Sequence, residues 1–328
     1  MACSFVGAVV CPPSFENPPE CDPFSSSFSF ACAQEQARKR AEQVLDLAAK
    51  AAPKADLVVL PEDIHGIRHF WRLLDSPNVP RRLAEPIPGP TVKAAARIAR
   101  KHKAHLVLSL YENYQNRIYN AVVLLSPRGK ILAHYRKTHL ACGEDWVVSP
   151  GEELLVVETK LGLIGIACGE DYLFPETACV LGRLNAEIVV CPSKVPIPEL
   201  ILAARSLQFG FATLFASPSS ALLIDSSGAA LAQSAGRRDL VLSTSFEPPA
   251  AVPNDRDALE SKLTGIEDPR ARLSGRRRPE LYHLLAERKW PEGKQLSPLR
   301  ARKKKWAAFN ELAILWENGP ELIPDWEL

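Results

Sequence analysis

The chain has 328 residues, a formal net charge of +2 and no apolar run long enough to span a membrane. With 46% hydrophobic and 24% charged residues it can bury a sizeable core, which excludes a disordered protein. The nearly neutral charge gives no reason to expect nucleic acid or a membrane surface as a partner.

The first residues, MACSFVGAVVCPP, lack the basic and long apolar segments of a secretory signal, so we expect a cytoplasmic protein. The cysteines show no pairwise spacing typical of a zinc site, and we expect them to be free thiols without a metal. They stand at positions 3, 11, 21, 32, 142, 168, 179 and 191.

Short runs rich in Val, Ile and Leu alternate with helical patterns up to residue 250, which predicts an α/β fold. The first strand is expected at 4–10, followed by a Pro-, Ser-, Phe- and Cys-rich loop over 11–32. A helix is expected over 34–51, because its apolar residues recur every three or four positions. The next strand, 56–60, ends just before Glu62.

A second helix is expected after Gly89 and Pro90, with Thr91 as its N-cap. Strands follow at 104–110, 118–125 and 130–135, the last two joined by a turn of the sequence SPRG. The remaining pattern predicts strands at 154–158, 163–167, 187–191 and 213–216, helices at 176–184 and 198–209, and a hairpin around 226–228.

After residue 250 the charge rises and the strand pattern ends. We expect residues 1–250 to form one domain and residues 251–328 a helical C-terminal extension. Trp306, Phe309 and Trp316 mark a helix there, for which we expect contacts within an oligomer. The extension also has basic runs, but solvated helix faces share that pattern, so no nucleic-acid partner is expected.

Cys168 is the strongest candidate nucleophile among the cysteines. It ends the apolar run LIGIA and precedes Gly169, which permits a sharp turn and whose N–H we expect to face an oxyanion. Cys191 also ends an apolar run, but Pro192 after it has no N–H. The other cysteines fit the ordinary role of a small buried hydrophobic residue better.

Glu62 and Lys137 are the candidate partners of this thiol. Glu62 follows the apolar run DLVVL and Pro61, and a carboxylate buried near a thiol would have a raised pKa suited to a general base. Strand alternation places Lys137 on one side with Tyr135 and His139, where its ammonium could stabilise an oxyanion. Each residue taken alone is equally compatible with a solvated or ion-paired side chain.

His134 and His139 keep a second arrangement open, a Cys–His pair of the protease type. We rank this arrangement second, because the sequence around either histidine resembles no protease signature.

The segments LVVLPE, YRKTHL and GIACGED, in this order, resemble the nitrilase superfamily of carbon-nitrogen hydrolases. The likeness continues through IPGPTVKAAARIARKHKAHLVLSLYEN, RIYNAVVLLSPRGKILAHYRKTHL and EDWVVSPGEE, and covers about residues 4–245. It implies a four-layer αββα sandwich, a triad of Glu62, Lys137 and Cys168, and dimers or higher homo-oligomers formed through helices near the nucleophile.

The resemblance also implies supporting residues. Glu112 stands where the family has an additional glutamate, and Glu144 where it often has another active-site glutamate. The family usually has an aromatic residue and then a carboxylate after the cysteine, whereas here Gly169, Glu170 and Asp171 follow and the turn is one residue longer. We therefore expect a turn of different shape, in which Gly169, Glu170 and Asp171 bind the substrate or support the catalytic residues. Which of the two carboxylates takes the place of the family's carboxylate stays open.

These features predict hydrolysis of a non-peptide C–N bond in a small molecule, through an acyl-enzyme on Cys168 and without a metal or organic cofactor. The expected substrates are amides and N-carbamoyl (ureido) compounds; nitriles are an alternative, disfavoured because the Cys-Trp-Glu run of true nitrilases is absent. A further alternative is a catalytically silent binding or assembly module with the same fold.

Overall fold

The computed structural model describes residues 4–12, 27–72, 78–141, 143–234 and 240–246. These residues belong to one compact unit, Met1–Ser274. The predicted extension over 251–328, with Trp306, Phe309 and Trp316, lies outside the described residues, so its helical character and its role stay predictions.

The described residues contain two six-stranded sheets with the same plan, parallel strands at the centre and antiparallel strands outside. The first sheet has the order β12-β1-β2-β3-β4-β5 and consists of β1 (Phe5–Cys11), β2 (Leu57–Val59), β3 (His105–Tyr114), β4 (Arg117–Leu125), β5 (Ile131–Arg136) and β12 (Leu240–Phe246). The second sheet has the order β11-β10-β9-β8-β7-β6 and consists of β6 (Val156–Thr159), β7 (Gly162–Ile166), β8 (Ile188–Pro192), β9 (Ala212–Ala216), β10 (Ala221–Ile224) and β11 (Ala230–Gln233).

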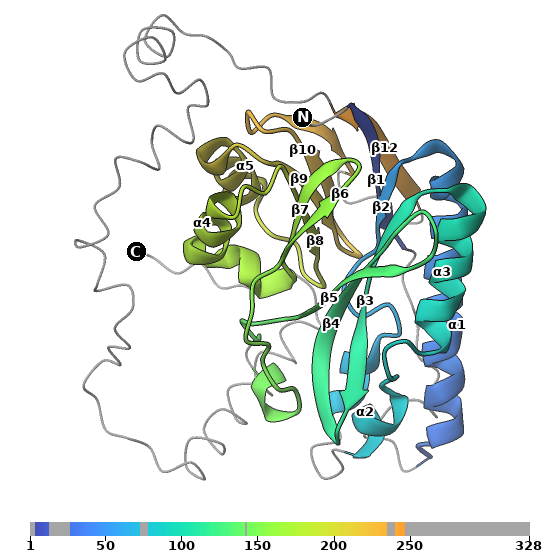
Figure 1. Cartoon of the computed structure of the whole chain (residues 1–328). Coiled ribbons are helices and arrows are strands. Elements are labelled where there is room, and N and C mark those ends of the chain that lie inside the picture. The colour runs from blue at the N-terminus through green and yellow to red at the C-terminus, as the bar shows by residue number, and fades with distance from the viewer. Residues whose placement is uncertain (1–3, 13–26, 73–77, 142, 235–239, 247–328) are drawn as a thin grey trace, which may run out of the picture. The chain divides into compact units, whose positions relative to one another are not determined.

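Helices cover the outer face of each sheet (Figure 1). The helices are α1 (Phe30–Ala51), α2 (Asn78–Leu83), α3 (Pro90–His102), α4 (Pro175–Arg183) and α5 (Glu199–Phe209). Short 3-10 helices complete the secondary structure: η2 (Ala52–Lys54), η3 (Ile67–Arg72), η4 (Glu144–Trp146) and η5 (Gly169–Leu173). Helices α1 and α3 pack on the first sheet, and α4 and α5 pack on the second.

Alternating strand side chains divide the core into layers, because successive residues of a strand point to opposite faces. In β2, Leu57 and Val59 belong to the cluster between the two sheets, whereas Val58 belongs to the cluster under α1 and α3. The inner cluster also receives Ile166 and Val190 from the second sheet. The predicted four-layer αββα sandwich is therefore confirmed.

Several element boundaries differ from the sequence prediction. Helix α1 begins four residues before the predicted start, because the Ser29 hydroxyl accepts a hydrogen bond from the Cys32 N–H and caps the helix. Thr91 is not the N-cap of α3: Gly89 takes that position, and the Thr91 hydroxyl donates to Glu85 instead. Strand β12 was not predicted at all; it pairs antiparallel with β1 along its whole length.

Cys32 corrects the expectation of free thiols, because it takes part in a disulfide. Spacing along the sequence could not reveal this bond, since the fold decides which cysteines meet. Cys11, Cys168, Cys179 and Cys191 take no part in a disulfide, as expected. Among the described residues, no helix combines the length and the apolar character needed to cross a bilayer.

Candidate active site

Glu62, Lys137 and Cys168 each follow a strand, and the structure brings them together. Glu62 follows β2, Lys137 follows β5 and Cys168 follows β7, and their exposed fractions are 3%, 0% and 0%. The Glu62 N–H donates to the Ser193 carbonyl at 3.2 Å, and the Lys194 N–H donates to the Glu62 carboxylate at 2.8 Å. These two bonds join the end of β2 in the first sheet to the end of β8 in the second.

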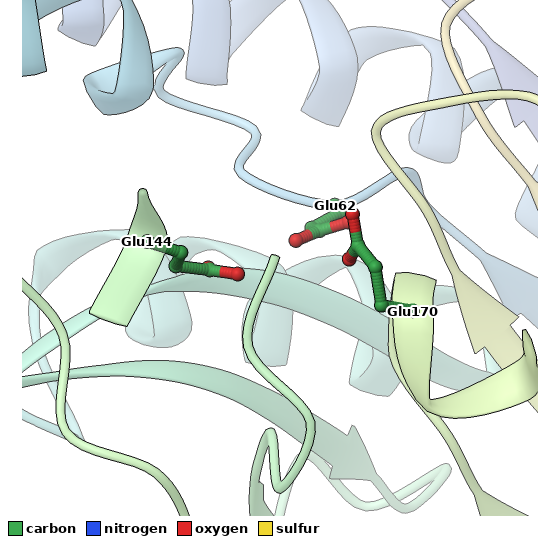
Figure 2. Close-up of side chains that lie close together, drawn as sticks. All are labelled: Glu62, Glu144 and Glu170. Carbon is green, nitrogen blue, oxygen red and sulfur yellow. The ribbon is translucent and has the colours of Figure 1, made fainter. Parts of the chain in front are cut away.

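Lys137 lies at the centre of the cluster. Its ammonium donates to Glu62 at 3.1 Å, to Glu144 at 2.9 Å and to Glu170. The three carboxylates converge from the segment after β2, from η4 and from η5 (Figure 2). A lysine ammonium has three N–H donors, so all of them are in use.

Asn120 and Tyr111 hold two of these carboxylates in place. The Asn120 amide donates to Glu62 at 2.6 Å and to Glu144 at 2.7 Å, and the Tyr111 hydroxyl donates to Glu144 at 3.1 Å. The sequence reasoning missed both residues. A signal existed for Asn120, because it interrupts the apolar run of β4 and is fully buried there, where an amide needs strong partners.

Gly169 connects the candidate nucleophile to its partners. Its φ of +51° lies in the left-handed region, which disfavours residues with a Cβ. A Cβ at this position would also lie 2.7 Å from the Glu62 carboxylate and 3.2 Å from the Lys137 ammonium. The turn after Cys168 therefore approaches both side chains as closely as only a glycine permits.

The role predicted for the Gly169 N–H, as a donor to an oxyanion on Cys168, stays a prediction. Burial raises the pKa of the neighbouring Cys191 thiol well above its usual range, and a backbone hydrogen bond from Gly169 opposes this rise. The Lys137 ammonium, close to the same turn, is the other candidate donor to an oxyanion.

Asp171 and Glu170, consecutive in η5, have different surroundings. Asp171 is fully buried and accepts hydrogen bonds from the Cys168 N–H, the Tyr135 hydroxyl and the His139 N–H at 2.7–3.0 Å. It fixes the turn to the segment after β5. Glu170 reaches Lys137 and keeps 19% of its side chain exposed. The longer turn thus provides one structural carboxylate and one at the site.

Glu112 lies apart from the cluster. Its carboxylate pairs with Arg136 at 2.7 Å and with His134 at 3.1 Å, and it lines a separate cavity of about 730 Å³. The alternation of β3 explains the difference, because Tyr111 points to the site and the next residue points to the opposite face.

The histidines do not form a Cys–His pair with Cys168. His139 contacts Asp171 at 3.0 Å and stacks on Phe174, while His134 pairs with Glu112. The Cys168 sulfur makes a weak contact of 3.9 Å with the Asn120 side-chain oxygen. The geometry therefore disfavours the protease-type arrangement.

The pKa values at the site follow from burial and from neighbouring charges. Burial raises the pKa of the Glu62 carboxyl, Lys137 opposes this rise, and Glu144 adds to it. Burial and then Glu62 raise the pKa of the Cys168 thiol well above its usual range. Burial disfavours the charged form of Lys137, but Glu62 and Glu144 raise its pKa well above the usual range. Both directions favour the protonated forms, a thiol at Cys168 and an ammonium at Lys137.

Glu62, Glu144 and Glu170 offer carboxylate oxygens within 4.8 Å of one another, a spacing that could hold a metal ion. The Lys137 ammonium already donates to all three carboxylates. A metal ion would have to replace this cation, so the arrangement fits a lysine-centred site better.

Comparison with known proteins supports the same family. A family model described as carbon-nitrogen hydrolase matches residues 17–241. The chain is 33% identical over 149 residues to an (R)-stereoselective amidase of Pseudomonas sp, covering 45% of this chain and 52% of that protein. It is 31% identical over 118 residues to an N-carbamoylputrescine amidase of Solanum lycopersicum, and the match covers 34% of this chain and 39% of that protein. The chain spans about half the length of the curated relatives it matches, or less.

Solved structures show the same fold. Nit3 of Saccharomyces cerevisiae, described as a member of the nitrilase superfamily, matches with a TM-score of 0.60 at 21% identity, over 81% of this chain and 96% of that one. A carbon-nitrogen hydrolase of Helicobacter pylori matches with a TM-score of 0.60 at 19% identity, over 87% of this chain and 99% of that one. At such low sequence identity these matches show a shared fold and nothing more.

Proposed function

Because the chain belongs to the carbon-nitrogen hydrolase family, we propose that it hydrolyses a non-peptide C–N bond of a small molecule through an acyl-enzyme on Cys168. One observation carries the proposal: the Lys137 ammonium donates to Glu62 directly beside the glycine that follows Cys168. A base, a cation and a thiol thus meet in one buried site, as covalent hydrolysis of an amide requires.

In the proposed reaction Glu62 accepts the thiol proton while the Cys168 sulfur attacks the carbonyl carbon. Lys137 donates a hydrogen bond to the oxyanion of the tetrahedral intermediate. Glu62 then returns the proton to the departing nitrogen, which leaves a thioester. A water molecule deprotonated by Glu62 attacks this thioester, releases the acid and restores the thiol. Glu144 holds Lys137 in position, and Asn120 orients Glu62.

Amides and N-carbamoyl compounds are the first substrate class that we propose. Relatives that match this chain are named an (R)-stereoselective amidase, an N-carbamoylputrescine amidase and a deaminated glutathione amidase. Nitriles come second, since one relative of Pyrococcus abyssi is named a nitrilase. The cytoplasmic location expected from the N-terminal residues stays a prediction.

The test is ammonia release from a panel of amides, ureido acids and nitriles, measured with the full chain. We expect hydrolysis of at least one amide or ureido compound and no turnover by the Cys168→Ala variant. Cys179→Ala is the matched control, because Cys179 is a free, partly buried thiol on α4. Undiminished turnover by Cys168→Ala would refute the proposal, and silence of the wild type across the panel would favour the non-catalytic module.

We also propose that the chain forms a homodimer through the helices of the second sheet. Large exposed hydrophobic side chains lie on or directly next to η5, α4 and α5, namely Leu173, Phe174, Val180, Leu184, Leu200 and Leu207. Exposed apolar surface of this kind favours a protein interface.

A further inference from the structure

The three carboxylates around Lys137 are held unequally. Glu62 also accepts hydrogen bonds from Asn120 and from the Lys194 N–H, and Glu144 is held by three further donors, from Asn120, Tyr111 and the Ala141 N–H. Glu170 accepts its hydrogen bond from Lys137, and the charge of Arg68 also attracts it. Its side chain is also the most exposed of the three. Glu170 is therefore the carboxylate that can leave most easily.

The proposed reaction requires one of these carboxylates to leave. All three N–H donors of Lys137 are occupied, so none is free for an oxyanion. Loss of Glu62 would remove the base, and loss of Glu144 would leave a buried carboxylate and a tyrosine hydroxyl without their partners. Displacement of Glu170 costs least, because its carboxylate can turn toward solvent or toward the substrate.

We propose that Glu170 leaves Lys137 when substrate binds and accepts a hydrogen bond from the substrate, so that the site selects amides or ureido compounds that carry an ammonium group. This inference rests on the proposed function. The displaced carboxylate exchanges one cationic partner, the lysine, for another, the substrate ammonium. Lys137 then donates the released N–H to the oxyanion.

The charges around the site favour a cationic substrate over an anionic one. The carboxylates at or beside the site are Glu62, Asp63, Glu144 and Glu170, and the cationic side chains are Arg68, Lys137 and Lys194. Carboxylates thus outnumber cations. Lys194 is engaged with Asp63 at 3.1 Å, which reduces its availability for a substrate carboxylate. An anionic substrate would add a like charge to a site that already has an excess of it.

The position of Glu170 fits this role. The turn after Cys168 has two consecutive carboxylates, and the buried Asp171 already fixes the backbone of the turn. Glu170 is not needed for that purpose, because its hydrogen bond comes from the Lys137 side chain, whereas Asp171 accepts from the backbone N–H groups of Cys168 and His139. The Glu170 side chain is long enough to reach Lys137, and part of it is exposed to solvent. A residue that contacts an entering substrate needs such exposure.

The test measures, by calorimetry, how tightly matched amides bind to the full chain carrying Cys168→Ala. The probes are an unbranched aliphatic amide, its ω-amino analogue and its ω-carboxy analogue, at several equal chain lengths. We expect the best ω-amino amide to bind on the order of tenfold more tightly than its neutral counterpart, as a charge-assisted hydrogen bond provides. In Cys168→Ala/Glu170→Gln this preference should disappear.

Glu158→Gln in the same background is the matched control, because it makes the same chemical change on an exposed carboxylate of β6 and should keep the preference. An unchanged preference in the Glu170→Gln variant, or no preference for any ω-amino amide, would overturn the inference. Because the Cys168→Ala protein cannot turn over substrate in the proposed reaction, ammonia release by the wild type tests the proposed function separately.

Discussion

Asn120 shows how one amide can organise an active site. Its two N–H donors bond to Glu62 and Glu144, which keeps two buried carboxylates apart in fixed directions. In Asn120→Ala both carboxylates lose a charge-assisted hydrogen bond worth about 1.5–3 kcal/mol. We expect kcat/KM to fall by roughly tenfold to a hundredfold, measured by steady-state kinetics on the best amide of the panel.

Asn113→Ala is the control for this change, because the Asn113 amide donates to the Arg81 carbonyl and not to the site. It should retain kcat/KM within about twofold. Equal losses in the two variants would show that Asn120 acts through general stability rather than through Glu62 and Glu144.

The raised pKa of Glu62 predicts the acid side of the pH–rate profile. Glu62 must be a carboxylate to accept the thiol proton, so activity should fall as the pH drops through its pKa. Burial raises that pKa, and Glu144 and Glu170 raise it further, so the loss should occur above the usual range for a glutamate.

Removing one of these neighbouring charges should move the profile in a known direction. In Glu170→Gln the acid limb of kcat/KM should shift to lower pH, because one negative charge near Glu62 is gone. If the acid limb stays in place or moves to higher pH, the loss of activity at low pH does not arise from protonation of Glu62.

At the residue scale the sequence predicted the residues that follow strands and missed those inside them. Glu62, Lys137 and Cys168 each follow an apolar run, and the family order tied the three together. Asn120 and Tyr111 lie within β4 and β3, where only the sheet register shows which side chains face the site. Glu112 was expected at the site because the family resemblance places an additional glutamate there, whereas the structure brings Tyr111 of the same strand to Glu144.

At the scale of elements, Asp171 joins the turn after Cys168 to the segment after β5. It accepts hydrogen bonds from Tyr135, Thr138, His139 and the Cys168 backbone, all within 3.0 Å. Asp171→Ala would leave several buried donors without a partner, so we expect the free energy of unfolding to fall by about 3 kcal/mol. Urea unfolding followed by circular dichroism measures this change.

Asp46→Ala provides the comparison for that measurement, since Asp46 is exposed on α1 and its loss should change stability by less than about 0.5 kcal/mol. If Asp171→Ala is as stable as this control, the turn does not depend on the Asp171 hydrogen bonds.

Hydrophobic periodicity located most of the described elements to within a few residues, and the errors have local causes. The start of α1 was misplaced because a side-chain cap at Ser29 precedes the periodic part of the helix. Strand β12 escaped prediction because its side chains are mostly part-exposed, and its pairing with β1 joins residues far apart in the chain. Long-range pairing of this kind has no local signature.

At the scale of the whole molecule, the proposed dimer predicts a measurable change of mass. Leu200 on α5 is 80% exposed, and Leu207 lies two turns further along the same helix. Leu200→Asp should weaken the interface, so sedimentation velocity should show a dimer for the wild type and a shift toward monomer for the variant.

Leu231→Asp is the matched control, because Leu231 is exposed on β11, outside η5, α4 and α5, and its replacement should leave the dimer intact. A monomeric wild type, or a Leu200→Asp variant that remains a dimer, would contradict the assignment of the interface to α4 and α5.

The identity of the nucleophile is the central claim, and a trapped intermediate tests it most directly. The full chain would be mixed with its best amide substrate, quenched in acid within one turnover and digested for peptide mass spectrometry. The acyl group should be found on the peptide that contains Cys168, and Cys168→Ala should carry no adduct. An acyl group on Cys191 or Cys179, or full turnover by Cys168→Ala, would contradict the proposed mechanism.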